Sequence, residues 1–260
     1  MSALGITQDI QTSRSRVRVR TLGAGEPVLL LHGVLSDAEV WKPLADELAQ
    51  THLCVIPDLT GFGQSDRPGL HHYAYGEDAW AEDAFDVLTA LGLPRAHVIG
   101  FAEGGHVAVR LASRAPSTVI SMASLASPLW STSGAKTRAS ASVPLWGRLA
   151  LMASLRSRDA RGDVTTGSMS DARGREVVRR MLRAGRDERT LRAALATLQT
   201  PLLIVLDAEA PDQTRVRIRL DTAGSDRVRV VRETSHNLRR GELDAGLLSR
   251  IREWLDTQAP

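Results

Sequence analysis

The chain has 260 residues, of which 43% are hydrophobic and 24% are charged, and its formal net charge is only +3. This composition excludes a disordered or collagen-like chain and suffices for a sizeable buried core. No apolar run approaches the roughly 18 to 20 residues of a membrane span, and the first residues lack the apolar stretch of a secretory signal. We therefore expect a cytoplasmic protein with no membrane partner. The single cysteine, Cys54, cannot form an internal disulfide, which agrees with a reducing compartment.

Basic charge is concentrated in one segment. Residues 131–200 hold 14 basic and 6 acidic side chains, and all but two of the 33 basic residues in the chain are arginines. Aromatic side chains that would stack on bases do not alternate with these arginines, and no nucleic-acid-binding motif is present. We therefore expect no nucleic-acid partner. The oligomeric state stays undetermined.

Short apolar runs alternate with longer amphipathic stretches, which is typical of a mostly parallel sheet covered by helices. In chain order, the pattern predicts strands at 16–20 (the first strand), 28–31, 52–56, 97–101, 119–125, 201–206 and 227–231. It predicts helices at 37–50, 77–91, 103–114 and 243–255. From Pro128 the sequence becomes rich in Ser, Ala and Arg. We expect a core of residues 1–128 and 201–260, with a helical lid at 129–200.

Four short motifs follow predicted strands along the chain. They are HGV at 32–34, DLTGFGQSDRP at 58–68, VIGFAEGG at 98–105 and TSHN at 234–237, each directly after or at the end of a predicted strand. Together they make the chain resemble the α/β-hydrolase-fold superfamily, in particular its small capped members. The resemblance covers nearly the whole chain outside the insertion, and it implies an α/β fold with helices on both faces of the sheet.

The resemblance assigns roles to individual positions. In the family, a strained turn between strand and helix carries the nucleophile, and glycines around it let the backbones pack closely. Two backbone N–H groups form the oxyanion hole, and by position these belong to Val34, which follows Gly33, and to Glu103. The side chain of Glu103 is expected to point into the following helix. His236 matches the histidine of the triad.

Two positions depart from the family pattern. The nucleophile position holds Ala102, whose methyl group cannot attack a carbon atom. The position of the family's acid, laid on residues 201–211, falls on Ala210, although a displaced acid at Asp207, Glu209 or Asp212 stays open. The chain therefore resembles a divergent member that lacks the triad.

Proton transfer next to a carbonyl group is the chemistry that a covered pocket, an oxyanion hole and one histidine can still perform. The family includes non-hydrolytic members of peptide and polyketide natural-product pathways, among them the bottromycin-pathway peptide epimerase, which lacks the usual triad. We therefore predict an epimerase or isomerase acting on a modified peptide or polyketide intermediate, with His236 or the substrate itself as the base. Two alternatives stay open: a ligand-binding pseudo-hydrolase without activity, and a serine hydrolase captured as a Ser-to-Ala variant.

The lid is expected to select the ligand. Its positive charge favours a small-molecule or peptide substrate that bears carboxylates, although its arginines can equally form the solvated face of a helix. Trp130 and Trp146 flank the start of the lid, where either can line the pocket or pack the lid on the core. His71 and His72 have no acidic or cysteine partners at metal-ligand spacing, so we predict no metal and no cofactor.

Overall fold

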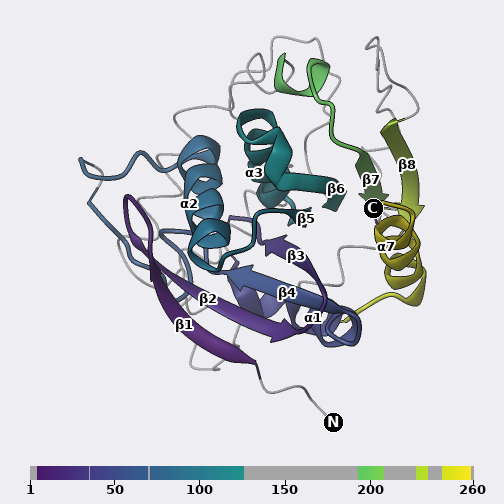
Figure 1. Ribbon diagram of the computed structural model, residues 1–260, viewed down its shortest axis with the longest axis horizontal. Helices are drawn as coiled ribbons and strands as arrows, with labels where there is room; N and C mark the ends of the chain where they lie inside the picture. Colours follow the sequence, from purple (N-terminus) through teal and green to yellow (C-terminus); the bar gives the residue numbers. More distant parts are fainter. Residues whose placement is uncertain are drawn as a thin grey trace, which may run out of the picture.

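A single mixed sheet organises the described part of the chain. The computed structural model describes residues 5–34, 36–69, 71–125, 193–207, 227–233 and 242–258. In these residues, eight strands pair in the order β1-β2-β4-β3-β5-β6-β7-β8 (Figure 1). The strands are β1 Ile6–Gln11, β2 Arg16–Gly23, β3 Glu26–Leu31, β4 His52–Pro57, β5 Ala96–Phe101, β6 Val119–Leu125, β7 Leu202–Asp207 and β8 Val228–Glu233.

Six strands run parallel in the spatial order β4-β3-β5-β6-β7-β8, and β2 pairs antiparallel with both β1 and β4. The carboxyl ends of parallel strands lie at one edge of a sheet, where ligand sites of open α/β folds form. Leu31, at the end of β3, pairs with Gly100 near the end of β5. The turns that follow these two adjacent strands are therefore neighbours.

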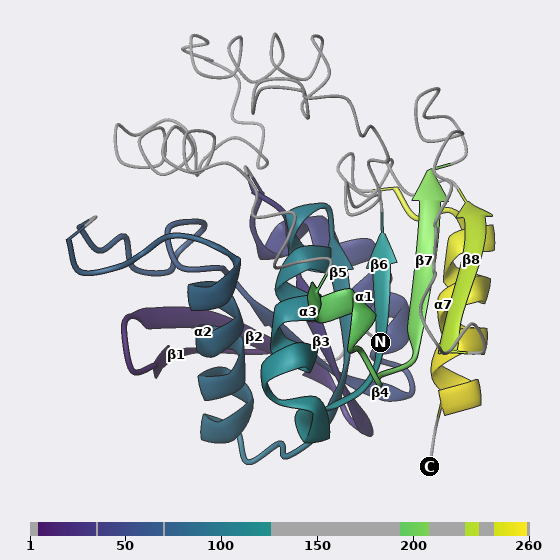
Figure 2. The same cartoon turned by 90° about the horizontal axis from the view of Figure 1, so that it is seen from above.

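Helices cover both faces of the sheet. They are α1 Lys42–Leu48, α2 Glu77–Ala90, α3 Glu103–Arg114 and α7 Ala245–Gln258, with short 3₁₀ helices at Ala38–Trp41 and Pro116–Thr118. Buried side chains of α2 and α3 belong to one hydrophobic cluster, and those of α1 and α7 belong to a second. Figure 2 shows α2 and α3 on one side of the sheet and α1 and α7 on the other. The predicted fold class is confirmed.

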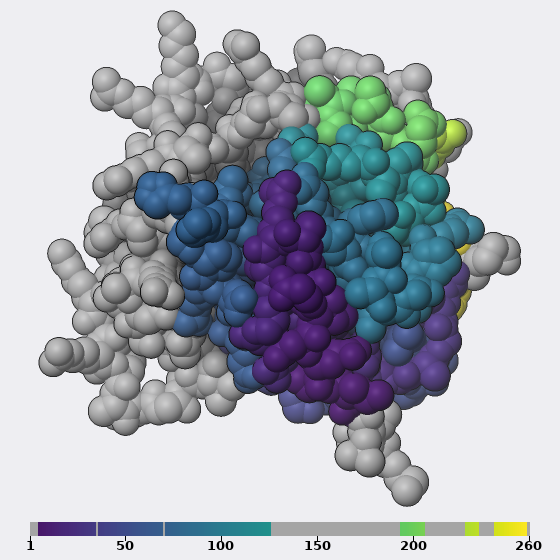
Figure 3. All heavy atoms as spheres, turned by 60° about the vertical axis from the view of Figure 1, so that its left-hand side comes forward, coloured from purple at the N-terminus to yellow at the C-terminus, as the bar shows by residue number. Residues whose placement is uncertain are grey.

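The prediction that 16–20 forms the first strand is wrong, because β1 precedes it. β1 has the sequence ITQDIQ, and Ile10 is its one buried residue. An edge strand buries little, so its hydrophobic alternation is weak. Figure 3 shows this N-terminal hairpin as a purple ridge on one face of the molecule. The carboxylate of Asp9 on β1 pairs with Arg16 and Arg18 on β2, which adds polar contacts across the hairpin.

The predicted helix at 37–50 is shorter and begins differently. A 3₁₀ turn comes first, with Asp37 accepting the N–H of Glu39 at 3.0 Å, and α1 starts at Lys42. Pro43 lies at the first turn of α1, where its missing N–H costs nothing. The other predicted helices and strands that fall within the described residues are confirmed, with ends that differ by at most three residues.

Most of the predicted lid lies outside the described residues. Of residues 129–200, the structure describes 193–200, which begin with a helical turn at 193–196. In the described part of the chain, no helix combines the length and the apolar character needed to cross a bilayer.

Candidate functional site

β5 passes into α3 through a sharp turn at Ala102. Ala102 has φ 51° and ψ −118°, and among the described residues it alone combines a side chain with a positive φ. A Cβ atom is disfavoured in this region of conformational space, so the turn stores strain. The resemblance assigns this turn to the nucleophile of the family, and here the turn carries an alanine that is 6% exposed.

Two glycines make the turn sterically feasible. A Cβ atom on Gly100 would overlap the backbone of Gly104, and a Cβ on Gly104 would overlap the carbonyl oxygen of Leu31. The start of α3 therefore packs directly on the ends of β3 and β5. The Ala102 N–H also donates to the carbonyl of Leu125, the last residue of β6, at 2.9 Å. These contacts hold the strained turn in place without help from a nucleophile.

The turn after β3 forms the other side of the site. A Cβ on Gly33 would lie 2.9 Å from the Cβ of Ala102, so glycine is required at this close approach. The next residue, Val34, directs its N–H toward the first residue of α3. The structure thus brings together four of the predicted site residues: Gly33, Val34, Ala102 and Glu103.

Buried polar side chains hold the Val34 turn. The Nε2 of His32 accepts the N–H of Leu59 at 2.9 Å, so its Nδ1 carries the proton and donates to the Gly33 carbonyl at 2.7 Å. Burial lowers the pKa of His32, which favours this neutral form, although the charge of nearby Asp58 opposes the shift. The Asp58 carboxylate accepts the N–H of Ala38 at 2.7 Å. These residues of the HGV and DLTGFGQSDRP motifs therefore fix the loop that positions the Val34 N–H.

The expectation that Glu103 points along its helix is wrong. Its Oε2 accepts the N–H of Val34 at 3.3 Å, and a Cβ on Gly33 would lie 3.3 Å from the same oxygen. A carboxylate oxygen therefore accepts one of the two N–H groups that the resemblance assigns to the oxyanion hole. A glutamate at the first position of a helix is also favoured by the helix dipole. The sequence signal was present, because a carboxylate followed the turn directly, but side-chain direction could not be inferred from spacing.

Several predicted site residues lie outside the described residues. These are His236, Ala210, Glu209, Asp212, Trp130 and Trp146. Asp207 is the last residue of β7 and so lies at the same edge of the sheet as Ala102. The roles of all these residues stay predictions.

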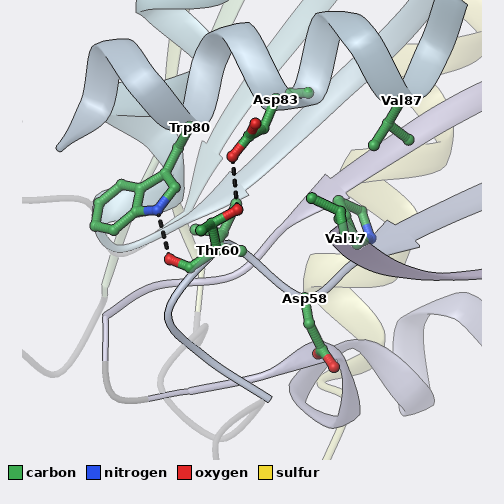
Figure 4. Close-up of a pocket in the computed structure, with 9 residues that line it drawn as sticks. Val17, Asp58, Thr60, Trp80, Asp83 and Val87 are labelled. Carbon is green, nitrogen blue, oxygen red and sulfur yellow. Dashed lines mark hydrogen bonds between the residues drawn. The ribbon is translucent and has the colours of Figure 1, made fainter. Parts of the chain in front are cut away.

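A buried acidic cluster under α2 was not predicted. Asp83 accepts hydrogen bonds from the hydroxyls of Thr12 at 2.7 Å, Thr60 at 2.6 Å and Tyr73 at 2.5 Å. Burial raises the pKa of Asp83, and these hydroxyl donors partly offset the shift. Figure 4 shows Thr60 and Trp80 beside a small cavity that this carboxylate helps to line. The cavity has room for about one water molecule, so it is a packing feature and not a substrate pocket.

Metal binding finds no support in the described part of the chain. Among those residues, no group of three or more His, Cys, Asp or Glu side chains could hold an ion. Burial raises the pKa of the Cys54 thiol to about 12, so this cysteine remains protonated near neutral pH and is a poor metal ligand.

Sequence comparison identifies relatives that match part of the chain. Over 117 residues, the chain is 33% identical to 2-hydroxymuconate semialdehyde hydrolase of Pseudomonas sp. (strain CF600), a match that covers 44% of this chain and 41% of that protein. Over 105 residues it is 35% identical to fluoroacetate dehalogenase of Burkholderia sp, covering 40% of this chain and 34% of that protein. The matched region thus spans about two fifths or less of the length of these relatives.

Comparison with solved structures extends over the whole chain. A candidate epoxide hydrolase from Pseudomonas aeruginosa matches with a TM-score of 0.78 and 23% identity, covering 98% of this chain and 96% of that one. This likeness concerns the fold. The family model described as the alpha/beta hydrolase fold matches residues 26–166, which include β3, the turn at Ala102 and α3. The chain therefore belongs to the α/β-hydrolase fold family.

Proposed function

We propose that this protein is a non-hydrolytic enzyme that transfers a proton at a carbon atom next to a carbonyl group. The observation that carries the proposal is Ala102: the strained turn is retained at φ 51°, but the side chain that would attack a substrate is a methyl group. A covalent acyl-enzyme cannot form there. The adjacent Val34 N–H, which donates to Glu103 Oε2 at 3.3 Å, can stabilise a developing oxyanion once a substrate carbonyl displaces that carboxylate.

The chemistry requires few groups. A base removes the proton from the carbon atom, the C–H electron pair forms the enolate double bond, and the carbonyl electrons move to oxygen, which accepts a hydrogen bond from Val34. Return of a proton to the same carbon completes exchange, and return to its opposite face inverts the centre. The proposal assigns the base to His236 or to the substrate itself, and it assigns substrate selection to a lid at 129–200.

A small molecule or a modified peptide is the proposed substrate. Relatives named as a semialdehyde hydrolase and a fluoroacetate dehalogenase support a small-molecule ligand. The net positive charge of residues 131–200 supports a substrate that bears carboxylates. A modified peptide or polyketide intermediate with an acidic α-proton combines these features.

Deuterium incorporation tests the proposal. Thioesters of N-acetylated amino acids with N-acetylcysteamine provide probes with acidic α-protons and an activated carbonyl. In heavy water, the protein is expected to place one deuterium at the α-carbon faster than buffer does, without releasing the thiol. Absence of enhanced exchange across hydrophobic, neutral and acidic amino-acid probes contradicts the proposal. Bound probes that raise the melting temperature but stay unexchanged support a binding protein without activity.

A serine hydrolase is the second candidate, and the hydrolase relatives favour it. It predicts that Ala102→Ser restores ester hydrolysis, since the turn and the Val34 N–H are already in place. A fluorophosphonate probe should then label the variant at residue 102 and leave the parent protein unlabelled. A folded Ala102→Ser variant that neither reacts with the probe nor cleaves activated esters eliminates this candidate.

A further inference from the structure

A carboxylate group contacts the N–H donor that the proposed reaction needs for its oxyanion, and a carboxylate can also act as the base. Glu103 Oε2 accepts the Val34 N–H at 3.3 Å and lies beside Gly33, whose own close neighbour is the Cβ of Ala102. Both residues of this contact come from rigid elements: Glu103 begins α3, and Val34 follows β3 in the turn that His32 holds. The carboxylate therefore lies between the turn after β3 and the start of α3.

The methyl group of Ala102 makes room for this arrangement. A nucleophile at residue 102 would place a polar atom beside the Val34 N–H, where it would compete with the glutamate for the same space and the same donor. With a methyl group there, the carboxylate is the polar group that meets the Val34 N–H. Glu103 is partly buried, so the group remains within reach of a ligand.

We propose that Glu103, in place of His236 or the substrate itself, is the catalytic base of the proton transfer, an inference that rests on the function proposed above. A substrate carbonyl oxygen takes over the hydrogen bond from the Val34 N–H and displaces Glu103 Oε2. The displaced carboxylate gives up the hydrogen bond that it accepted from the Val34 N–H. It then faces the carbon atom next to the carbonyl that has replaced it.

The proton balance follows directly. The C–H bond breaks, an O–H bond forms on Glu103, and the electron pair enters the enolate, whose oxygen is held by Val34. When solvent deuterium replaces that proton on Glu103, return of the deuteron to the same face of the carbon restores the configuration and produces isotope exchange. Inversion needs a second proton donor on the opposite face of the carbon.

Glu103→Gln is the decisive variant, because the amide keeps the size and an acceptor oxygen for the Val34 N–H but is not a base. With the thioester probes in heavy water, it should lower exchange by about 100-fold or more. Glu103→Asp should retain part of the rate. Glu82→Gln, on α2, is a matched control that alters only surface ion pairs with Arg14 and Arg114, and it should leave exchange unchanged.

The Val34 amide offers a readout that needs no substrate. In ¹⁵N-labelled protein, Glu103→Gln should shift the Val34 amide proton, whereas Glu82→Gln should not. An unmoved Val34 resonance overturns the contact and the proposal with it.

The remaining outcomes are distinct. If the wild type exchanges and Glu103→Gln exchanges equally, the base is His236 or the substrate, and only the assignment of Glu103 fails. If Glu103→Gln or Glu103→Ala exchanges faster than the wild type, the carboxylate merely competes with the substrate for Val34, and the assignment also fails. If the wild type shows no exchange, the proposed function itself fails.

Discussion

The strain stored at Ala102 can be measured by replacing this residue with glycine. Glycine adopts φ 51° and ψ −118° without the penalty that a Cβ atom imposes. Ala102→Gly should therefore release the strain of the turn while leaving its backbone path unchanged. Ala112→Gly, on the same helix and 1% exposed, makes the same chemical change where the backbone is helical.

The magnitudes follow from three contributions. Each variant loses one buried methyl group, which costs about 0.8 kcal/mol of stability. Each also gives the unfolded chain more conformational entropy, which costs a further 0.4–1 kcal/mol, roughly. Both effects destabilise Ala102→Gly and Ala112→Gly alike. Ala102→Gly alone recovers the strain of a disfavoured backbone conformation, about 1–3 kcal/mol. We therefore expect it to be about 2 kcal/mol more stable than Ala112→Gly and close to the wild type.

Chemical denaturation provides the free energies of unfolding, and thermal melting provides an independent comparison. For a chain of this size, a difference of about 2 kcal/mol corresponds to roughly 4–8 °C in Tm. Equal losses in the two variants would show that the turn at Ala102 carries no strain, and the argument from its conformation would then be refuted.

Three further predictions concern the surroundings of the site. Gly104→Ala should destabilise the protein by about 3 kcal/mol or more, or prevent folding, because the new Cβ would overlap the Leu31 carbonyl oxygen and backbone cannot give way there; a wild-type denaturation midpoint would contradict this. Because the pKa of Asp83 is raised above its ordinary 3.8, the stability it contributes is fully present below that pH and is lost as the pH rises through its folded-state pKa. Asp83→Asn should flatten this part of the stability profile, and an unchanged slope would count against the shift. The pKa of His32 is lowered from 6.5, so the stability that it contributes is present above pH 6.5 and is lost as the pH falls toward its folded-state pKa. His32→Gln should remove this pH dependence of stability, which urea titrations between pH 5 and 8 measure.

The sequence by itself determined the fold class and most of the elements. Apolar runs and amphipathic periodicity reflect which faces are buried, and burial is a local property of strands and helices in a parallel sheet. The glycines around residue 102 likewise indicated a tight strand-to-helix turn before any geometry was known. β1 escaped prediction because Ile10 is the one residue that it buries. The early start of the helix at 37–50 was wrong because the position of Pro43 limits the α-helix to Lys42 onward.

Only the tertiary structure decided which side chains and backbone groups of the site are hydrogen-bond partners. Glu103 and Val34 are separated by 69 positions, His32 and Leu59 by 27, and Ala38 and Asp58 by 20. Periodicity reports the face on which a side chain lies, but not its rotamer or its partner across the fold. The direction of Glu103 depends on how closely β3 and α3 approach, which the glycine contacts at Gly33 and Gly104 set. A pattern along one chain carries no information on such a distance, because it arises only when separate elements pack together.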